Sequence, residues 1–376
     1  MHAYIAGSVR LLAVPLLLAG VAAGIAPAAP AVAAPAESIG TPTFVHDQLN
    51  GVAATSASNA WAVGCTHCFT SKGMALVEHW NGTGWQQVAS PAPADSVLSG
   101  VAATSASSAW AVGCSNCNNF STRKTLILRW NGTGWKQVPS PGPAGSDLSG
   151  VAATSASSAW AVGSSTAGTS SKSLVLGWNG TAWKQVPSPS PAGSTLSGVA
   201  ATSASSAWAV GSDTAGTSSK SLVLGWNGTA WKQVPSPSGF LSGVAATSAS
   251  AWAVGYTSRV KTLVVRWNGT AWKQVPSPSP SSGGLADFLF GVAATSASSA
   301  WAVGDISCGC GPGISLILHW NGTAWTRVPS PTPGGGTILR GVAATSATDA
   351  WAVGYSGSGI GPTKTVILRW NGKTWN

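Results

Sequence analysis

The stretch that decides the fold is residues 148–189, which read LSGVAATSASSAWAVG, SSTAGTSSKS and LVLGWNGTAWKQVPSP in succession. All 21 tryptophans of the chain lie on this stretch and its close copies, three in each. Repetition at one period over most of a chain indicates a repeat architecture, in which each copy forms one supersecondary unit. The seven copies are spaced by 45 to 50 residues and begin at Gly51, Gly100, Gly150, Gly198, Gly243, Gly291 and Gly341.

Each copy contains four short segments with the composition of β-strands. In the third copy these are residues 150–154, 159–163, 174–178 and 183–186, and the Ser-Ala-Ser-Ser tract after the first is typical of a turn. The pair Asn179-Gly180 lies between two tryptophans and predicts a type I′ hairpin turn. Because four antiparallel strands in about 48 residues match one blade, the sequence predicts an all-β, seven-bladed β-propeller of four-stranded antiparallel blades.

The strand pattern also predicts how the blades pack. Residues 126–130, LILRW, are apolar on both faces, which indicates a strand buried on both sides, as between neighbouring blades. The first strand, Val-Ala-Ala, is the smallest, as expected where seven strands meet at an axis. The seventh copy reaches Asn376 before its fourth strand is complete. We therefore expect residues 37–42 to pair with residues 366–370, so that the N-terminal segment completes the last blade and closes the ring.

The N-terminal residues 1–34 read as a secretory signal peptide, with Arg10, an apolar run and a small-residue end at Ala31-Val32-Ala33-Ala34. An uncleaved membrane anchor is the alternative, although Pro15 interrupts a run that is short for a span. The remaining residues, 35–376, are then the propeller. We expect a secreted, extracellular protein with no stable membrane span once the signal is removed. Association with the cell surface is the alternative to release from the cell.

The chain has a formal net charge of +10, with basic residues dispersed at repeated positions before the third strand and along the fourth. The simplest interpretation is a solvated rim that keeps a weakly charged protein soluble. Weak attraction to polyanions, such as anionic cell-wall polymers, is the functional alternative. No nucleic-acid-binding motif accompanies the charge, so we expect no specific nucleic acid partner.

The repeated tryptophans and Asn-Gly-Thr triplets each allow two readings. Tryptophan can stack on sugar rings, but a position that recurs in all seven copies favours packing between blades. The six Asn-Gly-Thr sequons, which begin for example at Asn81 and Asn179, could be glycosylated. A tight turn explains the same residues, and we favour the turn.

Topology places the variable residues on one side of the expected ring. In an up-and-down blade the near-constant Ser-Ala-Ser and Asn-Gly turns share one face, and the connections that differ among copies share the other. Functional residues concentrate on variable loops held by a rigid scaffold, so we expect any site on that face, near the mouth of the channel. The candidate binding residues there are His67, Phe69, Phe120, Arg123, Tyr256, Arg259, Asp287, Asp305 and Tyr355.

All six cysteines lie on the same loops, as the pairs Cys65/Cys68, Cys114/Cys117 and Cys308/Cys310. An even count in a secreted chain predicts disulfides. The first two pairs could each close locally or cross-link to one another between neighbouring blades, and the third pair would close locally. A zinc site built from the two CxxC pairs has plausible spacing but suits a reducing compartment better, so we expect no metal.

Catalytic motifs are absent from the sequence, with no GxSxG, HExxH or phosphate-binding loop. Asp287, Asp305 and Tyr355 come from adjoining blades and could form a glycosidase-like cluster. Solvated loop carboxylates are the simpler expectation for the two acids. We therefore expect a protein that is not an enzyme and that needs no cofactor.

Trp110-Ala111-Val112-Gly113, followed by a strand and by residues 130–135, WNGTGW, resembles the secreted bacterial propellers built from WAVG and HWNGTxW repeats. Residues 319–325, HWNGTAW, match that pattern in full. Such propellers are distantly similar to Asp-box (sialidase-type) and kelch propellers. The resemblance covers residues 51–376 and implies the propeller fold. Together with the reading above, it leads us to expect a monomeric binding or scaffold module for a carbohydrate or protein ligand at the cell surface, with an extracellular carbohydrate-active enzyme as the alternative.

Overall fold

The computed structural model describes residues 46–376, except for 69, 167–169, 215–219, 249, 283, 309–311 and 359–360. The chain divides into the units Met1–Thr43 and Phe44–Asn376. The predicted signal peptide and the closing segment 37–42 lie outside the described residues. Within them, no helix is long and apolar enough to cross a membrane.

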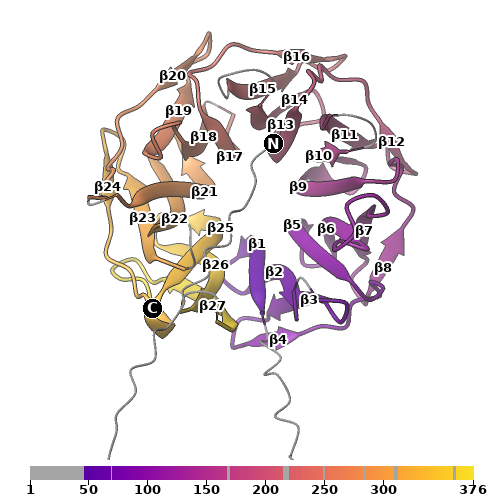
Figure 1. The fold of residues 1–376 in the computed structure, drawn as a ribbon, viewed down its shortest axis with the longest axis horizontal. Coiled ribbons are helices and arrows are strands. Elements are labelled where there is room, and N and C mark those ends of the chain that lie inside the picture. The colour runs from indigo at the N-terminus through magenta and orange to yellow at the C-terminus, as the bar shows by residue number, and fades with distance from the viewer. Residues whose placement is uncertain are drawn as a thin grey trace, which may run out of the picture. The chain divides into compact units, whose positions relative to one another are not determined.

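The described unit confirms the predicted seven-bladed propeller, with antiparallel blades arranged around an axis (Figure 1). The innermost strands are β1 (Gln48–Ser56), β5 (Ser96–Ser105), β9 (Ser146–Ser155), β13 (Ser194–Ser203), β17 (Phe240–Ala246), β21 (Ala286–Ser296) and β25 (Thr337–Ser346). The second strands are β2 (Asn59–Thr66), β6 (Ser108–Ser115), β10 (Ser158–Ser165), β14 (Ser206–Asp213), β18 (Ala251–Tyr256), β22 (Ser299–Ser307) and β26 (Asp349–Gly357).

The outer half of each blade is shorter and ends at the surface. The third strands are β3 (Met74–Trp80), β7 (Lys124–Trp130), β11 (Lys172–Trp178), β15 (Lys220–Trp226), β19 (Thr262–Trp267), β23 (Ile314–Trp320) and β27 (Thr363–Trp370). The fourth are β4 (Trp85–Gln87), β8 (Trp135–Val138), β12 (Trp183–Gln185), β16 (Trp231–Gln233), β20 (Trp272–Gln274) and β24 (Trp325–Arg327), and a single 3-10 turn, η1 (Pro333–Gly335), precedes β25. Blades are numbered 1 to 7 in chain order.

The seventh sheet has three strands, β25, β26 and β27, and in place of a fourth the last residues pair with β27. Trp375 forms an isolated bridge with Trp370, and the backbones of Asn376 and Arg369 exchange two hydrogen bonds. At the start of β27, Thr363 forms a parallel bridge with His46. The described part of the N-terminal segment therefore lies beside the last blade.

The repeated Gly-Val-Ala-Ala start is explained at the axis, where each first glycine faces the next. A Cβ atom on Gly150 would lie 3.2 Å from the Cα of Gly198, and one on Gly341 would lie 3.2 Å from the Cα of Gly51. The same approach links all seven blades, so the glycines form a closed ring. A side chain at these positions would push the neighbouring backbones apart by a few tenths of an ångström, which explains the repeated glycine.

The glycine that ends each Trp-Ala-Val-Gly has a different cause. In every blade the innermost strand carries one extra residue opposite the second strand, for example Ser149 between Leu148, which pairs with Gly163, and Gly150, which pairs with Val162. This is a β-bulge, which bends the strand. A Cβ atom on Gly163 would overlap the backbone oxygen of Asp147, so the bulge requires glycine on the partner strand.

Tryptophan packing between blades confirms the expectation from the sequence. The second-strand tryptophan of each blade packs against both outer tryptophans of the next; Trp110, for example, lies 4.9 Å from Trp178 and 5.1 Å from Trp183 between ring centroids. Trp351 closes the ring on Trp80 and Trp85 in the same way, at 5.0 and 5.2 Å. Such edge and tilted aromatic pairs stabilise beyond the area they bury.

The Asn-Gly turns differ from the predicted type I′ hairpin. Trp178 pairs directly with Trp183, so four residues lie in the turn, and only Gly180 has a positive φ. The side-chain oxygen of Asn179 accepts hydrogen bonds from the N–H groups of Thr181 and Ala182 and from the Thr181 hydroxyl. An asparagine that bonds its own following backbone stabilises a turn without φ > 0 at Asn, and it accounts for threonine as well as glycine.

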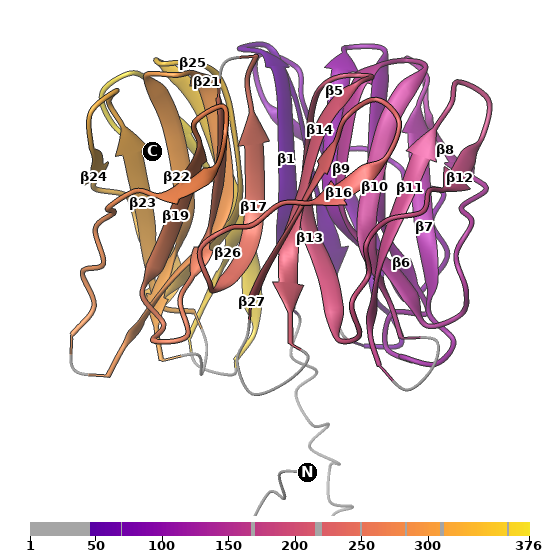
Figure 2. The ribbon, with the colours of Figure 1, turned by 90° about the horizontal axis from the view of Figure 1, so that it is seen from above.

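The strands run between two rims (Figure 2). The turn rim comprises the turns at 56–58 and 81–84 and their counterparts in the other blades, and the loop rim comprises the connections 67–73 and 88–95 and their counterparts. Within the loop rim, backbone hydrogen bonds join the connection between the second and third strands to the connection between blades. The Asp95 N–H donates to the Gly73 carbonyl at 2.7 Å, and the Cys117 N–H donates to the Asp95 carbonyl at 3.1 Å. The predicted separation of constant turns from variable loops is therefore confirmed.

Candidate functional site

The axial channel is narrow and lined mainly by backbone and small side chains. Its cavity has a volume of about 160 Å³, and the paired glycine and valine of every innermost strand line it, with the bulge residues Ser197 and Ser242. A ligand of any size must therefore bind at a mouth of the channel rather than inside it.

The bulge residues change character around this channel. Five of the seven are small and polar, namely Asn50, Ser99, Ser149, Ser197 and Ser242. Blades 6 and 7 instead carry Phe290 and Arg340. The guanidinium of Arg340 lies 4.4 Å from the centre of the Phe290 ring, a cation–π contact. Bulges commonly re-aim a side chain next to a functional site.

Further aromatic rings extend this pair toward the loop rim. Tyr256 stacks on Phe240 at 4.9 Å and meets Phe288 edge-on at the same distance, and Phe288 lies 6.0 Å from Phe290. Arg340 also donates a 3.3 Å hydrogen bond to the hydroxyl of Tyr355. We call this group, Phe240, Tyr256, Phe288, Phe290, Arg340 and Tyr355, the mouth cluster. It spans blades 5 to 7, and all of its members except Tyr355 are partly exposed.

The two acids of the proposed glycosidase cluster are buried, and the expectation of solvated carboxylates is wrong for both. Asp287 is fully buried and accepts hydrogen bonds from the Ser279 and Ser281 hydroxyls, while the Lys261 ammonium lies 3.7 Å away. These partners give it a structural role in the connection before β21. A burial of this kind follows from loop packing, which the sequence pattern does not reveal.

Asp305 lies at the equivalent position to Tyr256 and Tyr355 in its own blade and is 1% exposed. Burial raises its pKa to about 6, against the lowering effects of Ser307, Arg340 and the Gly313 backbone. Among the described residues, its oxygens lack a hydrogen-bond partner of good geometry. The carboxyl therefore titrates in the interior behind the mouth cluster.

The cysteines close locally, which decides between the two predicted pairings. Disulfides join Cys65 to Cys68 and Cys114 to Cys117. Cys308 is also disulfide-bonded, and its predicted partner Cys310 lies outside the described residues. No cluster of His, Cys, Asp and Glu suited to a metal ion occurs in the part of the chain that the structure describes.

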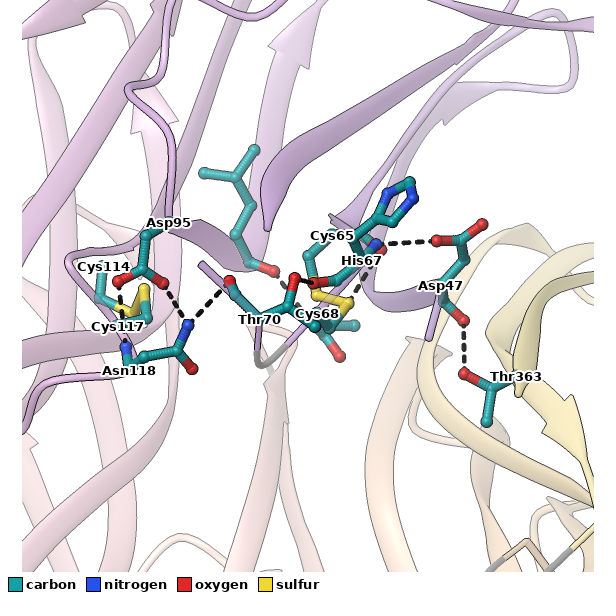
Figure 3. The surroundings of a disulfide bond; sticks show 12 residues. Asp47, Cys65, His67, Cys68, Thr70, Asp95, Cys114, Cys117, Asn118 and Thr363 are labelled. Carbon is teal, nitrogen blue, oxygen red and sulfur yellow. Dashed lines mark hydrogen bonds between the residues drawn. A yellow bond between two sulfur atoms is a disulfide. The ribbon is translucent and has the colours of Figure 1, made fainter. Parts of the chain in front are cut away.

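Polar contacts link the two disulfide loops to each other and to the last blade (Figure 3). The backbone carbonyl of Asp47 accepts a hydrogen bond from the Thr363 hydroxyl of the last blade. The side-chain carboxylate of Asp47 accepts a second one from the His67 N–H, at 2.9 Å. In the next blade, Asn118 donates to both the Thr70 carbonyl and the Asp95 carboxylate. The exposed His67 thus belongs to a hydrogen-bonded loop network in blade 1, apart from the mouth cluster of blades 5 to 7, and Phe69 lies outside the described residues.

The remaining predicted residues are separate from the mouth cluster. Phe120 is 69% exposed and lies 5.1 Å from the Arg123 guanidinium, which forms a 2.9 Å ion pair with Asp147. Arg259 is exposed on the loop between β18 and β19. Of the predicted residues, Tyr256 and Tyr355 belong to the mouth cluster, and Asp305 is buried in the same blade as Phe288. The other candidates are dispersed along the loop rim.

Four members of the mouth cluster were missed in the sequence, namely Phe240, Phe288, Phe290 and Arg340. The signal that could have found them is departure from the repeat: four copies have Leu-Ser before the conserved glycine, whereas the sixth has Leu289-Phe290 and the seventh Leu339-Arg340. A bulky or charged residue at a position that is otherwise serine or asparagine suggests function rather than packing.

Clefts at the outer edge recur in blades 2, 3 and 5, with volumes of about 490, 310 and 540 Å³. Each lies between the lysine or serine-threonine start of the third strand and the Pro-Ser segment after the fourth. The lining lysines are Lys124, Lys172 and Lys261, and the lining glutamines are Gln137, Gln185 and Gln274. They are a repeated feature of the scaffold.

No protein-family model matches the chain, and no curated protein matches it. Solved structures do resemble it. The BP39L lectin from Burkholderia pseudomallei superposes with a TM-score of 0.57 at 16% identity, over 89% of this chain and 98% of the lectin. YCF48 from Cyanidioschyzon merolae gives 0.53 at 15% identity over 87% and 96%, and YCF48 bound to D1 peptide gives 0.52 at 15% identity over 87% and 94%. At these identities the likeness shows the shared fold.

Proposed function

We propose that the chain is a secreted binding module that recognises a carbohydrate or protein ligand through the mouth cluster and takes no part in catalysis. The observation that carries the proposal is a group of partly exposed aromatic rings and an arginine on one side of the channel mouth, where the bulge residues of the other blades are small and polar. Aromatic rings with one positioned polar group are typical of ligand sites.

The structural neighbours support a binding role. One is a lectin and another is a complex with a peptide. Both share the propeller fold with this chain. Stacking on Tyr256 and Phe288, with hydrogen bonds from Arg340, would suit either a sugar ring or a peptide aromatic side chain.

The burial of Asp287 and its engagement by two serines argue against the paired carboxylates of a glycosidase. One observation keeps that alternative testable: Asp305, with a pKa of about 6, is protonated in part near neutral pH, as a general acid must be.

A combined screen tests the proposal. Wild-type protein is applied to glycan and peptide arrays, and any ligand found is titrated against Phe290→Ser and Arg340→Ser, which install the residue that blades 2 to 5 carry at the bulge. Binding should fall at least tenfold with unchanged melting temperature, and Ser149→Ala, at the bulge of blade 3, should bind normally. Unchanged binding by both mouth variants would refute the site, and hydrolysis of a bound glycan would favour the enzyme.

A further inference from the structure

Three blade interfaces have a cation over their tryptophans. The third strands of blades 2, 5 and 7 supply an arginine whose guanidinium lies over the second-strand tryptophan of its own blade and over an outer tryptophan of the next. The distances to the ring centres are 5.1 and 5.4 Å for Arg129 (Trp110, Trp178), 4.8 and 5.7 Å for Arg266 (Trp252, Trp320), and 4.7 and 5.3 Å for Arg369 (Trp351, Trp80).

Blades 1 and 6 have a histidine at this position instead. His79 lies 4.1 Å from Trp61, and His319 lies 4.2 Å from Trp301, between ring centroids. Blades 3 and 4 differ from all the others, because Gly177 and Gly225 occupy the position. No side chain of the third strand can then cover the tryptophans of these two interfaces.

Exposure of the tryptophans follows this substitution. The second-strand tryptophans of the five covered blades are at most 3% exposed. Trp160 is 7% exposed and Trp208 is partly exposed, which makes these two the most accessible of the seven. The interfaces after blades 3 and 4 therefore retain the indole pair and lack the group that fills the space elsewhere.

The guanidinium at blade 5 shows which further atoms line this space. Arg266 donates from Nε to the Ser250 hydroxyl at 3.0 Å and from Nη2 to the Ala297 carbonyl at 3.3 Å. Arg369 repeats the pattern with Asp349 and the Ala57 carbonyl. Arg266 and Arg369 thus each meet two indole faces and two hydrogen-bond acceptors, whereas the contacts given for Arg129 are those with the two indoles.

The interface between blades 3 and 4 keeps the whole set. Trp160 and Trp226 are the indole pair, 4.8 Å apart, and Ser158 stands where Ser250 does. The Ala204 carbonyl accepts from the Trp226 indole at 3.0 Å, as the Ala297 carbonyl does from Trp320 at 3.1 Å. The acceptor that Arg266 uses is therefore present in the same local geometry.

We propose that this interface binds a guanidinium group, presented as an arginine side chain of a partner protein, in the space that Arg266 fills at its own interface. Two indole faces beside a hydroxyl and a carbonyl oxygen favour a cation that carries N–H groups. Lys184, which pairs with Gly177, does not exclude it, because Lys273 pairs with Arg266 in the same way. Trp208 and Trp267 offer a second indole pair beside Gly225, 4.8 Å apart.

The site is on the side of the turn rim, at the opposite end of the strands from the mouth cluster. The third-strand position is the residue directly before the tryptophan that leads into the Asn-Gly turn. The proposal is therefore independent of the proposed function, and a partner could occupy both sites at once.

The experiment titrates the full chain with N-acetyl-arginine amide and follows the tryptophan indole N–H signals by NMR. Saturable shifts are expected for Trp160 and Trp226, and Gly177→Arg should abolish them because the chain then fills its own site. The converse variant, Arg129→Gly, opens the interface of blades 2 and 3 and should add shifts at Trp110 and Trp178.

Each comparison can overturn the proposal. Shifts of Trp160 and Trp226 that persist in Gly177→Arg would refute it. Absence of saturable shifts at these residues in the wild type, or at Trp110 and Trp178 in Arg129→Gly, would refute it as well. So would an equal response to methyl glucoside, which would make the interface a sugar platform instead. Melting curves confirm that each variant is folded, and Arg129→Gly supplies the test on its own if Gly177→Arg is not.

Discussion

Substitution of the glycine that ends Trp-Ala-Val-Gly should be among the most damaging single changes in this chain. In Gly113→Ala the new Cβ would overlap the Val97 carbonyl oxygen and lie 2.9 Å from the Leu98 Cα. Both are backbone atoms of the innermost strand, so no side-chain rotation can relieve the contact. The strand must move away from β6 and lose ladder hydrogen bonds beside the bulge.

The magnitude follows from those hydrogen bonds. A buried backbone group left without its partner costs about 1–3 kcal/mol, so loss of two bonds lowers the free energy of unfolding by about 2–6 kcal/mol. That is a large part of the total for a typical domain, about 5–15 kcal/mol. Urea denaturation followed by tryptophan fluorescence measures the change.

Gly134→Ala is the matched control in the same blade. A Cβ there meets no atom within 4 Å, and four other blades already carry alanine, for example Ala182. The control should be neutral or stabilising by up to about 1 kcal/mol, because alanine restricts the unfolded chain. If Gly113→Ala and Gly134→Ala had the same midpoint and slope, the bulge explanation would be wrong.

Three further changes test other parts of the structure. Because burial raises the pKa of Asp305 to about 6, the folded state holds this proton more tightly than the unfolded state. The contribution of this carboxyl to stability is therefore fully present below about pH 4 and is lost as pH rises through 6; denaturant midpoints should show Asp305→Asn removing up to about 3 kcal/mol of this pH dependence. The double variant Cys114→Ser and Cys117→Ser opens a short loop and should cost only about 2 kcal/mol, which calorimetry of the variant beside the wild type would reveal, whereas a complete loss of folding would contradict a local role. Trp351→Ala removes the packing that closes the ring on Trp80 and should lower the free energy of unfolding by about 3–5 kcal/mol. If limited proteolysis found no cleavage between the first and last blades of this variant, closure by this contact would be contradicted.

The repeat itself was enough to predict the blade number, because seven copies of 45 to 50 residues, each with three tryptophans, correspond to seven blades. Val-Ala-Ala at the axis, the tryptophans between blades and the variable loops on one rim all follow from patterns that recur seven times. The turn at Asn179 was predicted with the wrong geometry, because the side chain of that asparagine, rather than two positive φ angles, stabilises it.

The mouth cluster shows where sequence reasoning stopped. Tyr256 and Tyr355 were found from their place on variable loops, but Phe290 and Arg340 lie inside the repeat, where only their departure from the Leu-Ser of other copies distinguishes them. Asp287 and Asp305 look alike in the sequence, yet one is satisfied by serines and the other is buried with a raised pKa.

By itself, the sequence determined the architecture of this protein, because local strand and turn chemistry repeated at one period specifies a blade. Only the tertiary structure decided which side chains meet, since residues from different blades are brought together by ring closure and by the bulge, neither of which is encoded in neighbouring positions. Two glycines illustrate the difference. Gly113 is needed because the bulge brings backbone atoms too close for a Cβ, whereas Gly177 leaves the neighbouring tryptophans without the side chain that covers them in other blades.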